Sequence, residues 1–158
     1  MDVKIKSSEG NFKMRVAGCL VINNKLLTVK ICDNSFYCLP GGHVHLNESS
    51  KDAIEREFKE EVNIASEDNK LIAVVEGFFS NTDKTKLHEV CYYYLINTND
   101  NIEDKDYTYI ENDEGKLMNL EFKWVELNKL KDIDFRPRIL IEKLEKNSYY
   151  FEHLIDKE

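Results

Sequence analysis

The 158-residue sequence is poor in residues that interrupt regular structure, and it lacks any long apolar segment. It contains only two prolines and six glycines, and it has no repeats, low-complexity tracts or Pro/Gly-rich linkers. A chain of this length and composition is expected to fold as one domain, residues 1–158, around a sizeable core. Because neither a run of about 18 apolar residues nor the apolar segment of a signal peptide occurs, we expect a cytoplasmic protein without a membrane partner.

Paired metal-binding cysteines and an excess of positive charge are also missing. The four cysteines show no C-x-x-C spacing and lie in apolar or strand-like segments, which indicates reduced thiols rather than disulfides or zinc ligands. Lys plus Arg is 22 and Asp plus Glu is 30, so the net charge is −8. An acidic surface argues against general binding to nucleic acid. A polyphosphate ligand would need local cations or a bound metal.

One stretch, residues 39–64, combines a Gly-Gly pair after a proline with an uninterrupted helical pattern. We expect the glycines to form a turn, and Ser49 or Ser50 to cap the helix that follows. Apolar residues recur at helical spacing and form a stripe that can pack on a core. This stripe consists of Ile54, Phe58 and Val62.

A second stripe on the same helix consists of Glu57, Glu60 and Glu61. Carboxylates at positions i, i+3 and i+4 repel one another. A divalent cation such as Mg²⁺ or Mn²⁺ would relieve that repulsion, because hard cations prefer oxygen ligands. A solvated acidic helix face is the plainer interpretation of the triplet alone. The preceding glycines favour a ligand site, because they let the backbone approach a ligand closely.

Residues 42–64 resemble the Nudix box. That signature has a glycine, five residues, a glutamate, seven residues, and then Arg-Glu-apolar-any-Glu-Glu-any-Gly-apolar. Gly42, Glu48 and the run REFKEEVNI (56–64) match every fixed position except the last glycine, which is Asn63. Asparagine is the non-glycine residue best suited to a left-handed conformation, so we expect Asn63 and Asn47 to adopt that conformation.

The resemblance implies an α/β fold, the Nudix-type α/β/α sandwich with a mixed β-sheet. It also implies a metal-dependent hydrolase of a nucleoside diphosphate linked to another group, in which water attacks a phosphorus of the pyrophosphate. The expected partner is a small nucleotide, and a homodimer is compatible with the family. A nucleotide-binding sensor module without catalysis is the alternative. Markers of the ADP-ribose, NADH, diadenosine polyphosphate and coenzyme A subfamilies are missing, which weakens those assignments and leaves nucleoside triphosphates and nucleotide sugars open.

The resemblance also implies roles for individual residues. The metal ligands would be Glu57, Glu60 and Glu61, with the carbonyl of Gly42 as a further ligand. Arg56 would orient the glutamates through ion pairs, and Glu48 would be the partner of Arg56. The general base is either Glu57 or an acid of the later segment. The later acids are Glu111, Asp113 and Glu114, of which we favour Glu114.

Other polar residues are candidates for substrate contacts. Arg15, near the start of a predicted strand, could meet a phosphate, and a surface arginine is the plainer interpretation. His88 and Glu89 open a strand expected to face the same region. Trp124 is expected in the core.

The predicted elements are strands, with the box helix and one terminal helix. The strand segments are 3–6, 12–17, 16–22, 26–31, 36–39, 71–79 and 90–96, with 120–125 as the last strand. Asn23 and Asn24 give a hairpin signal. Residues 97–116 are expected to be loop-like, and the terminal helix is expected over 138–146.

Overall fold

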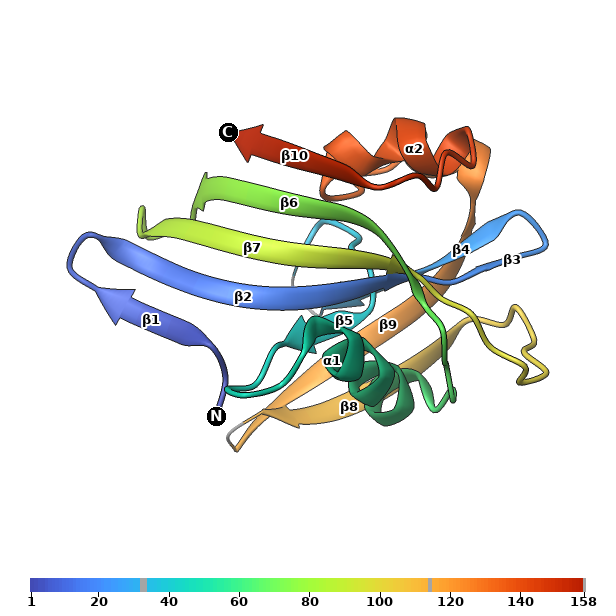
Figure 1. The fold of residues 1–158 in the computed structure, drawn as a ribbon, viewed down its shortest axis with the longest axis horizontal. Coiled ribbons are helices and arrows are strands. Elements are labelled where there is room, and N and C mark those ends of the chain that lie inside the picture. The colour runs from blue at the N-terminus through green and yellow to red at the C-terminus, as the bar shows by residue number, and fades with distance from the viewer. Residues whose placement is uncertain (32–33, 114, 158) are drawn as a thin grey trace.

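The computed structural model describes residues 1–31, 34–113 and 115–157. Within these residues two β-sheets form the body of the molecule (Figure 1). The larger sheet contains β1 (Lys4–Ser7), β2 (Gly10–Cys19), β5 (Gly41–His43), β6 (Lys70–Ser80), β7 (Lys86–Leu95) and β10 (Glu152–Lys157). The smaller sheet contains β3 (Val21–Ile22), β4 (Lys25–Ile31), β8 (Tyr107–Asp113) and β9 (Lys116–Glu126).

The helices are short. Helix α1 (Ser50–Glu57) continues directly into a π-helical turn, η1 (Phe58–Val62). Two 3₁₀ segments, η2 (Leu127–Asp132) and η3 (Arg138–Leu140), precede helix α2 (Ile141–Glu145). The predicted terminal helix therefore begins as a 3₁₀ turn.

The larger sheet is mixed and is covered on both faces. Strands β2 and β7 run parallel, as do β6 and β10, whereas β6 and β7 are antiparallel. Along β2, Val16 packs in the cluster that contains Ile54 of α1, and the next residue, Ala17, packs in the cluster that contains Leu144 of α2. Figure 1 shows the two helices on different sides of the strands. The mixed α/β fold inferred from the sequence is confirmed.

Several details differ from the sequence expectations. Residues 107–113 form strand β8 and are not a loop, because Tyr and Thr favour strands despite the acidic residues around them. The strand around residues 120–125 is not the last, because β10 follows it as a half-exposed edge strand. Gly41 and Gly42 lie in strand β5, paired with β2, and do not form a turn. The hairpin prediction is correct, since Asn23 and Asn24 both have the positive φ of a tight turn.

Lys143 of α2 connects the helix to the segment that leads into β10. Its side chain is 3% exposed, and its ammonium group forms an ion pair with Glu152 at 2.6 Å. The same Nζ donates hydrogen bonds to the carbonyls of Ser148 at 2.8 Å and Tyr150 at 2.7 Å. The six residues of β10 then pair with β6 from Ala73 onwards, which completes that edge of the sheet.

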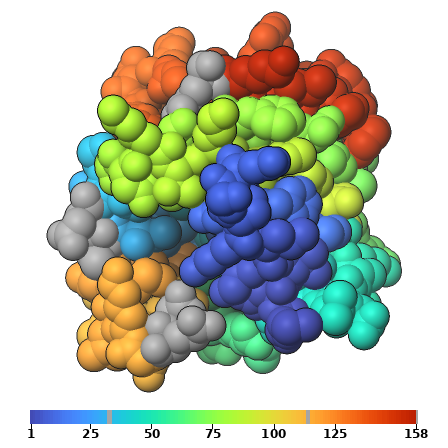
Figure 2. Space-filling view, turned by 90° about the vertical axis from the view of Figure 1, so that its left-hand side faces the viewer, coloured from blue at the N-terminus to red at the C-terminus, as the bar shows by residue number. Residues whose placement is uncertain are grey.

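The turns of three hairpins lie at one end of the molecule. Figure 2 shows this end, with the β1–β2 hairpin in front, the β6–β7 tip above it and the β8–β9 hairpin below. Strand β5 pairs with β2, and helix α1 also packs against β2. The box residues therefore lie between the larger sheet and the β8–β9 hairpin.

Candidate active site

The box helix is fixed at both ends by side-chain and backbone caps. The Ser49 hydroxyl accepts a hydrogen bond from the backbone N–H of Asp52 at 3.0 Å, which confirms the predicted N-cap. The helix ends at Asn63, whose φ of 56° and ψ of 36° are left-handed as expected. Asn47 also has a positive φ, 66°. Asparagine thus replaces glycine at both positions without disrupting the helix ends.

The second half of this helix is π-helical, which was not predicted. Segment η1 carries Glu60 and Glu61, and the backbone N–H of Asn63 bonds to the carbonyl of Phe58. Phe58 itself is fully buried, and a Cβ at Gly18 would lie 2.2 Å from its ring, so β2 must have a glycine there. Single π-helical turns are rare and are frequent at functional sites.

Arg56 is the central cation of the site. Its guanidinium donates to both carboxylate oxygens of Glu48, through Nε at 2.7 Å and Nη2 at 3.0 Å. Nη1 donates to Glu57 at 2.7 Å and to Glu60 at 3.3 Å. Nη2 also reaches the carbonyl of His43 at 3.0 Å. The expected Arg56–Glu48 pair is present, and the same arginine holds two glutamates of the triplet.

Glu48 is held as a carboxylate by these contacts. The hydrogen bond from Arg56 is the largest cause that lowers the pKa of Glu48 to about 2, and the backbone N–H of His45 donates a further bond at 2.8 Å. Fork-shaped arginine–carboxylate pairs of this kind fix orientation as well as charge. Glu48 therefore holds Arg56 in place.

Glu57 lies against strand β5 at a position where only glycine fits. A Cβ at Gly42 would lie 2.3 Å from Oε1 of Glu57, so the glycine of the signature creates the space for this carboxylate. Gly41 is equally constrained, because its φ is 159° and a Cβ would lie 2.1 Å from the carbonyl oxygen of Val16. Glu57 is 8% exposed, and burial raises its pKa.

Glu61 is the most strongly perturbed carboxylate of the site. Burial, followed by the charges of Glu57 and Glu111, raises the pKa of Glu61 to about 8. Arg15 and a hydrogen bond from the backbone N–H of Gly41 act in the opposite direction. Glu57 is buried and Glu61 is half-buried, and these neighbouring carboxylates with raised pKa values form a site that an external cation would stabilise.

The donor set fits a hard divalent cation. Within residues 1–31, 34–113 and 115–157, no three His, Cys, Asp or Glu side chains are already arranged as a metal site. Glu57 is close enough to raise the pKa of Glu61, and Glu60, whose side chain is 60% exposed, lies at the edge beside Arg56. Carboxylates are the ligands that Mg²⁺ and Mn²⁺ prefer. The residues present therefore fit such an ion chemically.

Arg15 and Glu89 lie on one face of the larger sheet. Nη1 of Arg15 is 3.9 Å from Oε2 of Glu89, and Nζ of Lys13 is 3.0 Å from the same oxygen. The charge of Arg15 opposes the rise in the pKa of both Glu57 and Glu61, so the arginine is within electrostatic reach of the box. Lys13 was not singled out from the sequence. The available signal was the alternation of side chains along β2, because Lys13 lies two residues before Arg15 and therefore on the same face of the strand.

His88 lies on the opposite face from Glu89. Its ring stacks on Phe78 at a centroid distance of 4.5 Å and meets the edge of Phe12 at 5.2 Å. Neighbouring residues of a strand point to opposite faces of the sheet, so His88 and Glu89 cannot both face the same region. The structure brings Arg15 and Glu89 together and places His88 among aromatic side chains.

The favoured later acid, Glu114, lies outside the described residues. Glu111 lies on β8, and its charge raises the pKa of Glu61. Tyr107, four residues earlier on the same strand, stacks on the buried ring of Phe122 at 4.6 Å, so this face of β8 is turned towards the core. From the sequence, Glu111 and Glu114 were expected in the same loop, whereas the structure places Glu111 on a strand.

The model of the NUDIX domain family matches residues 12–144. The chain belongs to the Nudix family. Family membership identifies it as a pyrophosphohydrolase that acts on small nucleotide substrates. No curated protein matches the sequence.

Solved Nudix structures share the fold at low sequence identity. The MutT protein from Bacillus halodurans superposes with a TM-score of 0.60 at 11% identity, over 89% of this chain and 89% of its own. A Nudix hydrolase from Nitrosomonas europaea gives 0.56 at 19% identity, over 92% and 79%. The MutT Nudix hydrolase from Burkholderia pseudomallei gives 0.53 at 19%, over 83% and 96%. No helix among the described residues is long and apolar enough to cross a membrane.

Proposed function

We propose that the chain hydrolyses the pyrophosphate bond of a nucleoside diphosphate linked to another group, with Mg²⁺ or Mn²⁺ as cofactor. Glu57, Glu60 and Glu61 would hold the cation, with the carbonyl of Gly42 as a further ligand. The observation that carries this proposal is the pair of Glu57 and Glu61, because burial raises both pKa values and the neighbouring charge of Glu57 raises that of Glu61 further.

The cation, when bound, would neutralise phosphate charge and acidify water. The chain's own residues perform the remaining tasks. Arg56 holds Glu57 and Glu60 in position, and Glu48 fixes Arg56. Lys13 and Arg15 share the face of β2 that carries Ala17, opposite to α1, and the charge of Arg15 reaches Glu57 and Glu61, so these cations would supply positive charge for a phosphate.

We expect one of two carboxylates to take the proton from the attacking water. Glu57 lies within the box, and Glu111 lies on β8 with its charge acting on Glu61. Glu111 is the stronger candidate of the later acids, because its strand is packed on the core and its charge acts directly on Glu61. No observation favours the alternative of a sensor without catalysis, since the glutamate triplet is complete.

The test is hydrolysis of a panel of nucleoside triphosphates, nucleotide sugars and other nucleoside diphosphate derivatives, with Mg²⁺, Mn²⁺ or EDTA. We expect release of nucleoside monophosphate or phosphate from one class, and loss of that release in EDTA. Glu61→Gln should lower turnover by several orders of magnitude, because it removes one ligand charge and keeps the size of the side chain. Glu55→Gln makes the same change on the same helix, outside the triplet, and should leave turnover unchanged. Normal turnover of Glu61→Gln, or full activity in EDTA, would refute the assignment.

A further inference from the structure

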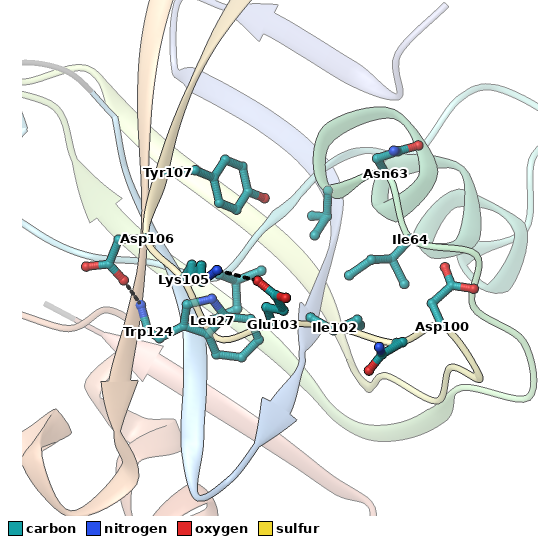
Figure 3. A pocket seen from close by; sticks show the side chains of 12 residues that line it. Leu27, Asn63, Ile64, Asp100, Ile102, Glu103, Lys105, Asp106, Tyr107 and Trp124 are labelled. Carbon is teal, nitrogen blue, oxygen red and sulfur yellow. Dashed lines mark hydrogen bonds and ion pairs between the residues drawn. The ribbon is translucent and has the colours of Figure 1, made fainter.

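A cavity of about 560 Å³ lies beside the C-terminal end of the box helix and is not used by the site described above. Figure 3 shows Tyr107 and Trp124 of the smaller sheet on one side, Asn63 and Ile64 on the other, and the loop before β8 below them. The complete lining is Leu27, Val62, Asn63, Ile64, residues 100–103, residues 105–107 and Trp124.

The indole N–H of Trp124 has no acceptor. Nε1 is buried, and no hydrogen-bond partner for it exists in the described part of the chain. The backbone N–H of the same residue is satisfied by Asp106 at 2.9 Å. Trp124 was expected in the core; it packs against a core cluster, but it is only half-buried and also lines the cavity. A buried donor without a partner destabilises a protein, so an acceptor that enters the cavity would gain a hydrogen bond from this indole.

The rest of the lining determines which ligands fit. Three carboxylates, Asp100, Glu103 and Asp106, accompany one lysine, Lys105, which is paired with Glu103 at 2.6 Å. Figure 3 shows this ion pair between the two walls. The surplus of negative charge disfavours a phosphate or a carboxylate. The carboxylate oxygens accept hydrogen bonds from N–H groups, while Leu27, Ile64 and Ile102 supply apolar surface.

The cavity adjoins the candidate active site. Val62 and Asn63, which line it, directly follow Glu61. Burial and the charge of Glu61 together raise the pKa of the Tyr107 hydroxyl to about 12, so this phenol remains a donor beside the box. A group bound in the cavity can therefore be part of a molecule whose phosphates lie at the glutamates.

We propose that this cavity binds a nucleobase, the planar uncharged end of the substrate. A base offers a ring nitrogen or carbonyl to the indole N–H and exocyclic N–H groups to the carboxylates, and its ring matches the aromatic wall. The statement that the base is part of the substrate rests on the proposed function. The statement that a base binds in the cavity rests only on the residues that line it.

Trp124 is the only tryptophan of the chain, so its fluorescence reports directly on the cavity. The first experiment titrates the intact protein in EDTA with adenosine, guanosine, cytidine and uridine, and with ribose 5-phosphate as the probe that lacks a base. At least one nucleoside should change the emission saturably, and ribose 5-phosphate should not. The absence of a response to all four nucleosides, or an equal response to ribose 5-phosphate, would overturn the proposal.

A variant tests the indole contact itself. Trp124→Phe keeps an aromatic ring and removes the donor, and it should bind the same nucleoside about three- to tenfold more weakly by calorimetry, the effect of one lost hydrogen bond. Its melting temperature should be equal to or higher than that of the parent, because an unpaired buried donor is removed. Tyr109→Phe, on the same strand as Tyr107 and outside the lining, is the control and should bind normally. Unchanged affinity in Trp124→Phe contradicts the proposal.

The two proposals fail separately. Hydrolysis of nucleotides without nucleoside binding would refute the cavity assignment and leave the pyrophosphohydrolase intact. Nucleoside binding without metal-dependent hydrolysis would refute the proposed function and keep the cavity as a nucleoside site.

Discussion

The ion pair between Glu48 and Arg56 gives a prediction whose size follows from the structure. Glu48→Gln keeps the side-chain length but removes the charge that Arg56 contacts through two nitrogens. The pKa of Glu48 falls from 4.5 to about 2 in the folded protein. A shift of that size corresponds to about 3 kcal/mol. The pair lies at the protein surface, with the Glu48 side chain 15% exposed, so solvent screening reduces the expected contribution to about 1–2 kcal/mol.

The pH dependence separates this mechanism from a loss of packing. A lowered carboxylate pKa stabilises the folded state above the unfolded pKa, 4.5, and this stabilisation is lost as the pH falls towards 2. The variant should therefore melt about 2–8 °C below the parent at pH 7, since about 1 kcal/mol shifts the melting temperature of a domain of this size by about 2–4 °C. The difference should be constant above pH 5 and shrink below pH 4.5.

The assay is thermal or urea unfolding, followed by circular dichroism in EDTA at a series of pH values. Glu55→Gln is the matched control, because it makes the same substitution on helix α1. A difference that stays the same between pH 7 and pH 3 would refute the ion-pair explanation. In that case, the effect of the substitution would come from packing or from the hydrogen bond of the His45 amide.

Three further predictions concern the same helix. Glu61→Gln should stabilise the protein in EDTA by about 1–3 kcal/mol at pH 8, because a carboxyl with a raised pKa destabilises the folded state as the pH rises from 4.5 to about 8. If the gain in the free energy of unfolding, measured in urea, does not grow over this pH range, the charge explanation is contradicted. Gly42→Ala should lower turnover about a hundredfold or more while the fold persists, because the new Cβ would meet the Glu57 carboxylate at 2.3 Å; wild-type kinetics would show that this contact does not position Glu57. Asn63→Val should lower the free energy of unfolding by about 1–2 kcal/mol, because a β-branched residue is strained at a φ of 56°, whereas Asn63→Gly should stay close to the parent in the same melting experiment.

The local features of the box were predictable from the sequence, because they depend on spacing and on single-residue conformational preferences. Ser49 caps the helix, and the glutamates at 57, 60 and 61 share one region near Arg56. Asn63 adopts the left-handed conformation that its position in the signature requires. These features need only the chain neighbours of each residue, so a linear pattern contains the necessary information.

Features that depend on distant partners were missed. Strand β10 pairs with residues about eighty positions earlier, whereas strand β8 forms a local hairpin with β9 and was missed because acidic residues surround its Tyr and Thr residues. Gly41 and Gly42 have a turn-like composition, yet contact with β2 and with Glu57 makes them a strand. Glu111 and Trp124 gain their places from the smaller sheet. No local periodicity reports such tertiary contacts.

The environment of Lys143 gives β10 a natural chemical reporter. The three protons of its ammonium group have three acceptors, at Ser148, Tyr150 and Glu152, and the side chain is 3% exposed. Amine-directed acylating reagents require an accessible nitrogen, so this lysine should remain unlabelled while most of the other lysines react. Its acylation, followed site by site by mass spectrometry, would therefore measure how often the final strand separates from the sheet in the native protein.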